Sequence, residues 1–115
     1  MSKKSAKKRE KSIKAKGNPL FAKVGLIGGC TQETADGFIE AIRKDENKKA
    51  KFAFKEVDDI CVNCLHSFVA NNKLSVLFLE ENLTINDEPN KVYDQVVSYI
   101  GYMHDCKIYI VAKVE

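Results

Sequence analysis

The 115-residue sequence has no tryptophan, only two prolines and two histidines, and no apolar run near the length of a membrane span. A helix needs about 20 apolar residues to cross a bilayer, so we expect no membrane span. Four cysteines in a chain of this length are too few for a small disulfide scaffold. The lysine-rich N-terminus lacks the apolar core of a signal peptide, and we therefore expect an intracellular protein, cytoplasmic or nuclear.

Charge is divided unevenly along the chain. Residues 1–19 carry eight Lys or Arg side chains and one Glu, a formal charge of +7, whereas residues 20–115 carry 11 Lys or Arg against 15 Asp or Glu, a charge of −4. Gly and Pro interrupt regular structure, so Gly17-Asn18-Pro19 marks the boundary between these parts. We predict a disordered basic tail over residues 1–19 and one compact domain over residues 20–115.

The apolar pattern after Pro19 alternates between strand and helix periods. It predicts strands over residues 20–29, 50–57, 73–81 and 107–115, with residues 83–85 as a short extension paired to the third of these. Helices are predicted over residues 30–47, over residues 60–72, and from Asp87-Glu88-Pro89 onward. The order β-α-β-α-β-α-β predicts an α/β domain with a four-stranded, mostly parallel or mixed sheet packed by three helices.

Each predicted helix carries an apolar face at helical spacing. The first face, after a cap at Cys30 or Thr31, comprises Ala35, Phe38, Ile39 and Ile42. The second, after a cap at Asp58 or Asp59, comprises Ile60, Cys61, Cys64, Leu65, Phe68 and Val69. The third comprises Val92, Tyr93, Val96, Val97 and Ile100.

The segment ICVNCLH, residues 60–66, holds two of the four cysteines and one of the two histidines. Because Cys61 and Cys64 fall within the predicted apolar face, the pattern favours buried cysteines that fill the core as small hydrophobic residues. Two alternatives stay open. A Cys-x-x-Cys pair at the start of a helix is typical of redox sites. Zinc, the one cofactor that the sequence suggests, would take four soft ligands from Cys61, Cys64, His104 and Cys106.

Glycines mark the junction between the first strand and the first helix. Gly28, Gly29 and Thr31 occupy the place where doubly wound folds bind phosphates with backbone amides, which makes them candidate anion-binding residues. The spacing matches neither established glycine-rich phosphate motif, and a tight turn explains the glycines equally well. No catalytic constellation stands out, and no motif assigns the chain to a family.

The basic tail is the most unusual feature of the sequence. Lysine and arginine side chains bind phosphates and release counterions, so such a segment supplies affinity for nucleic acid without reading its sequence. We therefore expect a non-enzymatic binding module in a larger assembly, whose tail engages RNA or DNA. Its candidate contacts are Lys3, Lys4, Lys7, Lys8, Arg9, Lys11, Lys14 and Lys16.

Two other functions remain open at this point. The first is a protein-interaction or regulatory domain, including an inhibitor of a partner enzyme, whose acidic body contacts protein while the tail is incidental. The second is a small redox or nucleotide-dependent enzyme that uses Cys61 and Cys64 or the glycine turn.

Overall fold

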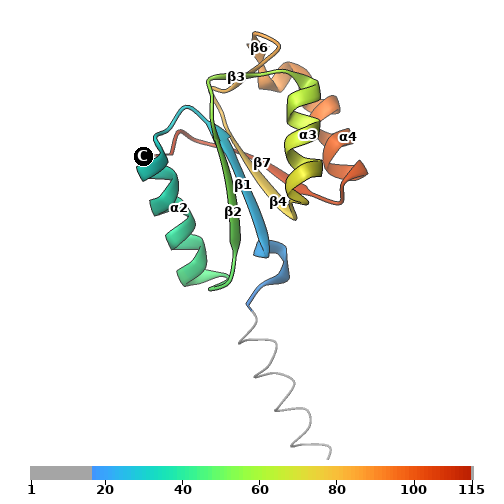
Figure 1. Ribbon diagram of the computed structural model, residues 1–115. Coiled ribbons are helices and arrows are strands. Elements are labelled where there is room, and N and C mark those ends of the chain that lie inside the picture. The colour runs from blue at the N-terminus through green and yellow to red at the C-terminus, as the bar shows by residue number, and fades with distance from the viewer. Residues whose placement is uncertain (1–16, 115) are drawn as a thin grey trace, which may run out of the picture.

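Four parallel strands form the central sheet of the structure, a computed structural model in which residues 17–114 are described (Figure 1). They are β1 (Lys23–Gly28), β2 (Lys51–Glu56), β4 (Val76–Glu80) and β7 (Lys107–Val111), and they lie in the order β2-β1-β4-β7. The predicted α/β class, element order and four-stranded sheet are confirmed. The predicted tail, apart from Gly17, Asn18 and Pro19, lies outside the described residues.

Helix α2 (Gln32–Asp45) covers one face of the sheet, and α3 (Val62–Asn72) and α4 (Asp94–Met103) cover the other (Figure 1). Residues of β1 contribute to the core on both faces of the sheet, because successive side chains of a strand point to opposite faces. On the α2 side the core contains Val24, Leu26, Ala35, Ile39, Ile42 and Val76. On the other side it contains Ile27, Leu65, Val69, Leu77, Leu79, Val97 and Ile100.

The first described residues, from Gly17 onward, lie against the segment between α2 and β2. Asn18 caps a short 3₁₀ helix, η1 (Pro19–Phe21), and its backbone N–H donates to the carbonyl oxygen of Glu46 at 2.9 Å. The side-chain amide of Asn47, itself buried, donates to the carbonyl oxygen of Asn18 at 3.2 Å. These bonds hold Asn18 against the segment between α2 and β2.

A small second sheet joins the loops at the carboxyl end of the central strands. It contains β3 (Asp59–Ile60), β5 (Thr84–Ile85) and β6 (Glu88–Pro89) in the order β3-β5-β6. The prediction that residues 83–85 pair with the third strand was wrong, because β5 pairs with β3 and β6 instead. The buried side-chain amide of Asn90 supports the connection between β4 and β5 by donating to the carbonyl oxygens of Glu80, Glu81 and Leu83.

The starts of the second and third helices differ from the prediction. Cys61, not Asp58 or Asp59, caps α3, since Asp59 is taken into β3 and accepts from the Thr84 hydroxyl at 2.6 Å. The third helical segment begins after Pro89 as a 3₁₀ helix, η2 (Asn90–Tyr93), before α4. Val92, predicted to be buried, is 63% exposed because it lies on this tighter turn, outside the period of α4.

Between residues 17 and 114, no helix is both long and apolar enough to cross a bilayer.

Candidate functional site

Seven lysines gather at the amino end of the central sheet, a group that we call the basic end. β1, β2 and β7 each begin with a lysine, and the first residues of parallel strands lie at the same edge of a sheet. The crossover helices α2 and α3 return to this edge, which brings the residues that end or follow them to it. The basic end comprises Lys23, Lys44, Lys48, Lys49, Lys51, Lys73 and Lys107.

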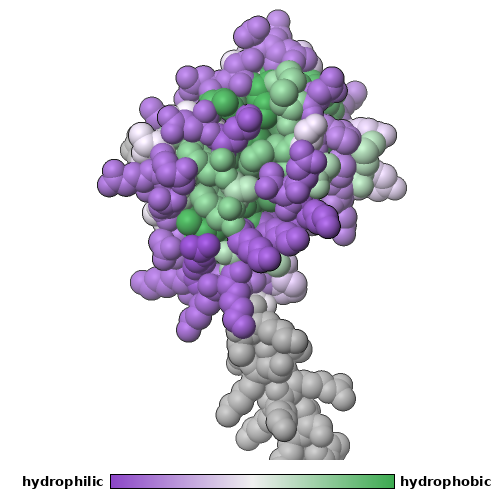
Figure 2. Space-filling view, in the orientation of Figure 1, coloured by the Kyte–Doolittle hydropathy of each residue, from purple (hydrophilic) through white to green (hydrophobic). Residues whose placement is uncertain are grey.

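The charge of the basic end is available to a ligand. All seven lysines are exposed except Lys23, which is half-buried. Among the described residues, the single ion pair joins Arg43 to Glu40 at 3.2 Å, so none of the seven lysines is paired with a carboxylate there. Asp45, Glu46 and Asp105 are the carboxylates at this edge. Figure 2 shows hydrophilic side chains gathered at this lower end of the domain.

Lys23 and Lys51 line a cavity of about 230 Å³ at the basic end. The two residues are neighbours in register on β1 and β2. Asn71 and Asn72, from the last turn of α3, line the same cavity. Ammonium and amide groups donate hydrogen bonds to phosphate oxygens, so this hollow suits an anionic group.

Acidic side chains lie at the opposite, carboxyl end of the sheet. They belong to the strand ends and to the loops of the second sheet, and are Glu56, Asp58, Asp59, Glu80, Glu81, Asp87 and Glu88. Three lysines accompany them, Lys55, Lys91 and Lys113. The domain is therefore polarised, with its positive edge at Asn18, where the chain enters.

The sequence-predicted phosphate contacts, Lys3 to Lys16, lie outside the described residues. The basic end was missed, although the sequence carried a signal for it: the segments predicted as the second, third and fourth strands each contain or begin with a lysine at their start. In a parallel sheet those starts share one edge.

Cys61 and Cys64 are exposed, so the prediction that they fill the core was wrong. Cys61 is the N-cap of α3, and its Sγ accepts a hydrogen bond from the backbone N–H of Cys64 at 3.1 Å. A hydrogen bond from the Cys64 thiol lowers the pKa of Cys61 and raises that of Cys64. This arrangement makes Cys61 the more nucleophilic of the pair.

The structure does not bring the four candidate zinc ligands together. His104 is the C-cap of α4, and its backbone N–H donates to the carbonyl oxygen of Ile100 at 3.1 Å. Cys106 is buried, and this burial raises its pKa to about 11. In the part of the chain that is described, no three His, Cys, Asp or Glu side chains are grouped so as to hold a metal ion.

The glycine turn after β1 is filled by carboxylates. A Cβ at Gly28 would collide with the carboxylate of Glu80, and one at Gly29 would collide with that of Asp58. Glu80 is buried, and its Oε1 accepts from the backbone N–H of Cys30 at 3.0 Å. Thr31 caps α2 by accepting from the N–H of Thr34. Two negative charges at this turn oppose a bound anion, so the geometry gives no support to a phosphate site there.

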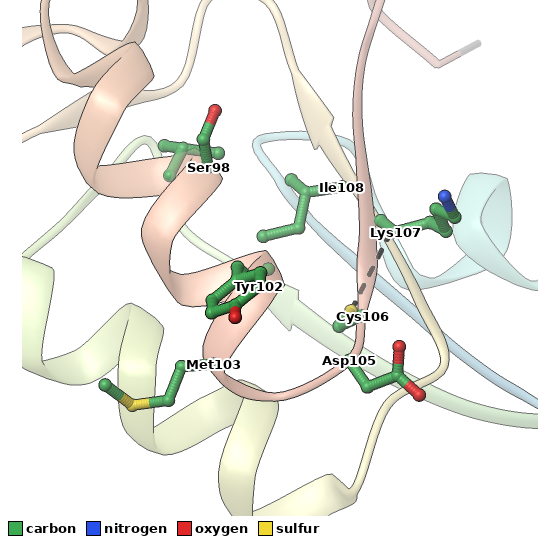
Figure 3. A pocket seen from close by; sticks show the side chains of 9 residues that line it. Ser98, Tyr102, Met103, Asp105, Cys106, Lys107 and Ile108 are labelled. Carbon is green, nitrogen blue, oxygen red and sulfur yellow. Dashed lines mark hydrogen bonds between the residues drawn. The ribbon is translucent and has the colours of Figure 1, made fainter.

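Exposed apolar side chains occur on η2, on α4 and on the edge strand β7. They are Val92, Tyr99, Tyr102, Met103, Tyr109 and Ile110, of which Tyr109 lies on the α2 face of the sheet, stacked on Phe78. Between α4 and β7 lies a cavity of about 690 Å³, whose lining includes Gly101, Tyr102 and Ile108 (Figure 3). Buried Cys106 lies at its base, with its thiol toward the carbonyl oxygen of Lys107 at 3.8 Å.

The chain was compared with protein-family models, curated proteins and solved structures, and none of the three comparisons gave a match.

Proposed function

We propose that this protein is a non-enzymatic binding module that engages RNA or DNA, within a larger assembly, through residues 1–16 and the basic end acting together. The observation that carries the proposal is the position of seven lysines, none paired with a carboxylate within residues 17–114, at the edge where the cationic N-terminal segment joins the domain. The acidic residues at the far edge orient a polyanion toward this one side of the molecule.

The distribution of charge favours an anionic ligand over a neutral one. The N-terminal segment carries eight cationic side chains, and the basic end extends that charge onto a rigid surface. Phosphate contacts position a nucleic acid and contribute affinity without sequence readout. The protein therefore binds nucleic acid with little sequence preference and a steep dependence on salt.

The experiment compares the binding of a labelled single-stranded oligonucleotide by four chains. They are the full chain, a chain without residues 1–16, a Lys48→Gln/Lys49→Gln/Lys51→Gln variant, and a control with Lys55→Gln/Lys91→Gln/Lys113→Gln. Both triple variants remove three positive charges, but only the first removes them from the basic end. We expect weaker binding for the deletion and for the first variant, and near-normal binding for the control. Equal binding by the deleted and full chains would overturn the proposal.

A second candidate function, contact with a protein partner, is favoured by the exposed apolar side chains on α4 and β7. β7 is the last strand of the sheet, and its exposed Tyr109 and Ile110 flank the free edge. An extended partner segment that paired with β7 would complete the sheet. Affinity capture after nuclease treatment separates the two functions, because a partner bridged by nucleic acid is lost and a direct partner is retained.

A further inference from the structure

Two histidines and a methionine converge between α3 and the end of α4. Nε2 of His66 lies 3.3 Å from Nε2 of His104 and 3.3 Å from Sδ of Met103. The two rings meet edge to face, with centroids 4.5 Å apart and planes at 83°. Figure 3 shows the Met103 side chain extending from the last turn of α4, where Met103 is also among the residues that line the cavity beside β7.

These two separations are short enough for His66 to share a metal ion with His104 and with Met103. A metal-bound imidazole nitrogen lies about 2.0 Å from the ion, so two nitrogens on one ion are at most about 4 Å apart. A sulfur ligand at about 2.3 Å extends the limit for a nitrogen–sulfur pair to about 4.3 Å. Both observed separations lie within these limits.

The chemistry of the three atoms selects the ion. A thioether is a soft, uncharged ligand, and soft sulfur ligands favour Cu(I), whereas zinc sites use thiolate, imidazole and carboxylate. The described residues offer no group of three His, Cys, Asp or Glu, so the thioether has to supply the third ligand. We propose that His66, Met103 and His104 bind one Cu(I) ion.

The site is reachable without opening the core. Met103 is 46% exposed, and both histidines are half-buried. His66 lies in the middle of α3, whereas Met103 is the last residue of α4 and His104 is its C-cap. A bound ion would therefore also link the two helices. This proposal is independent of nucleic-acid binding, because none of the three residues belongs to the basic end.

The test must separate this site from the exposed Cys61–Cys64 pair, since thiolates also bind Cu(I). We would titrate a Cys61→Ser/Cys64→Ser chain with Cu(I) under anaerobic conditions against bicinchoninate, a coloured Cu(I) chelator. Serine is a good N-cap, so this background preserves the start of α3. We expect one Cu(I) per chain, and an affinity at least tenfold weaker after Met103→Leu, His66→Gln or His104→Gln.

Tyr102→Leu is the matched control, because Tyr102 is 87% exposed beside Met103 and offers no soft ligand. Circular dichroism checks that each variant is folded. X-ray absorption of the Cu(I)-loaded background chain should show one sulfur at about 2.3 Å that Met103→Leu removes. A background chain that retains no Cu(I), or an affinity that Met103→Leu leaves unchanged, would overturn the proposal.

Discussion

Lys23 and Lys51 lie opposite each other, in register, at the start of the parallel strands β1 and β2. Neighbouring strands are about 4.8 Å apart, so the two ammonium groups share one edge of the sheet. Like charges on neighbouring strands destabilise a sheet. A polyanion relieves this repulsion, which links the stability of the domain to its proposed ligand.

Lys51→Gln should therefore separate binding from stability. Removing one positive charge should weaken oligonucleotide binding and lower the magnitude of the salt slope by about 0.7 for a single strand. The free energy of unfolding should stay constant or rise by about 0.5 kcal/mol, because the repulsion from Lys23 is lost. Fluorescence anisotropy and urea unfolding measure the two effects.

Lys55→Gln is the control on the same strand. Lys55 is also exposed but lies near the carboxyl end of β2, so its removal should leave binding nearly unchanged. Equal losses of affinity for Lys51→Gln and Lys55→Gln would show that position on the domain does not matter.

Cys61 should be the most reactive thiol of the folded protein. Its pKa is lowered by the hydrogen bond from Cys64, whereas burial raises the pKa of Cys30 and Cys106. Peptide mass spectrometry after a short iodoacetamide pulse at neutral pH should find Cys61 modified first, and the two buried cysteines modified only after unfolding. Cys64→Ala should slow the reaction of Cys61, and similar rates at all four cysteines would contradict this assignment.

Cys106 should make the domain less stable in alkaline solution. Its pKa rises from 9.0 to about 11 on folding, so above pH 9 the unfolded chain loses this proton while the folded chain retains it. Stability is therefore complete below pH 9 and falls as the pH rises toward 11, by up to about 2–3 kcal/mol from this group. Urea unfolding across this range should show a smaller fall for Cys106→Ala, and identical pH profiles would contradict the prediction.

Glu80→Gln should destabilise the fold. The two carboxylate oxygens of Glu80 accept from the backbone N–H groups of Cys30 and Val114, at 3.0 and 2.6 Å. An amide replaces one acceptor by a donor and leaves a buried N–H without a partner, at a cost of about 1–3 kcal/mol. Urea unfolding measures this loss. Glu81→Gln, at an exposed neighbouring position, should change stability by less than about 0.5 kcal/mol.

The hydrophobic pattern was sufficient to predict the order of elements, because the buried residues of α2 repeat at helical spacing and β1 is a short apolar run that is buried on both faces. It failed around Cys61, because this residue caps α3 and so lies outside the helical period. The true start of α3 depends on the pairing of Asp59 with Thr84, 25 residues away, which the local pattern does not contain. Val92 was misassigned for the same kind of reason, since its turn precedes α4.

The candidate sites differ in how far the sequence could reveal them. The basic end follows from two facts within reach of the sequence, lysines at strand starts and a parallel sheet. The approach of His66 to Met103 and His104 depends on how α3 and α4 pack, and no spacing in the sequence encodes it. The sequence also gives no signal that Met103 is a ligand, because structural metal motifs are defined by cysteine and histidine.

The salt dependence of nucleic-acid binding tests the central claim most directly. We would measure the affinity of the full chain for a labelled single-stranded RNA by fluorescence anisotropy between about 50 and 200 mM salt, the range over which phosphate contacts lose most of their affinity. Contacts by most of the eight N-terminal cations should contribute about −4 to −6 to the slope of log K against log salt, and the basic end should make the total slope steeper. Removal of residues 1–16 should reduce it to the contribution of the basic end. A slope near zero, or no binding at the lowest salt, would contradict the account.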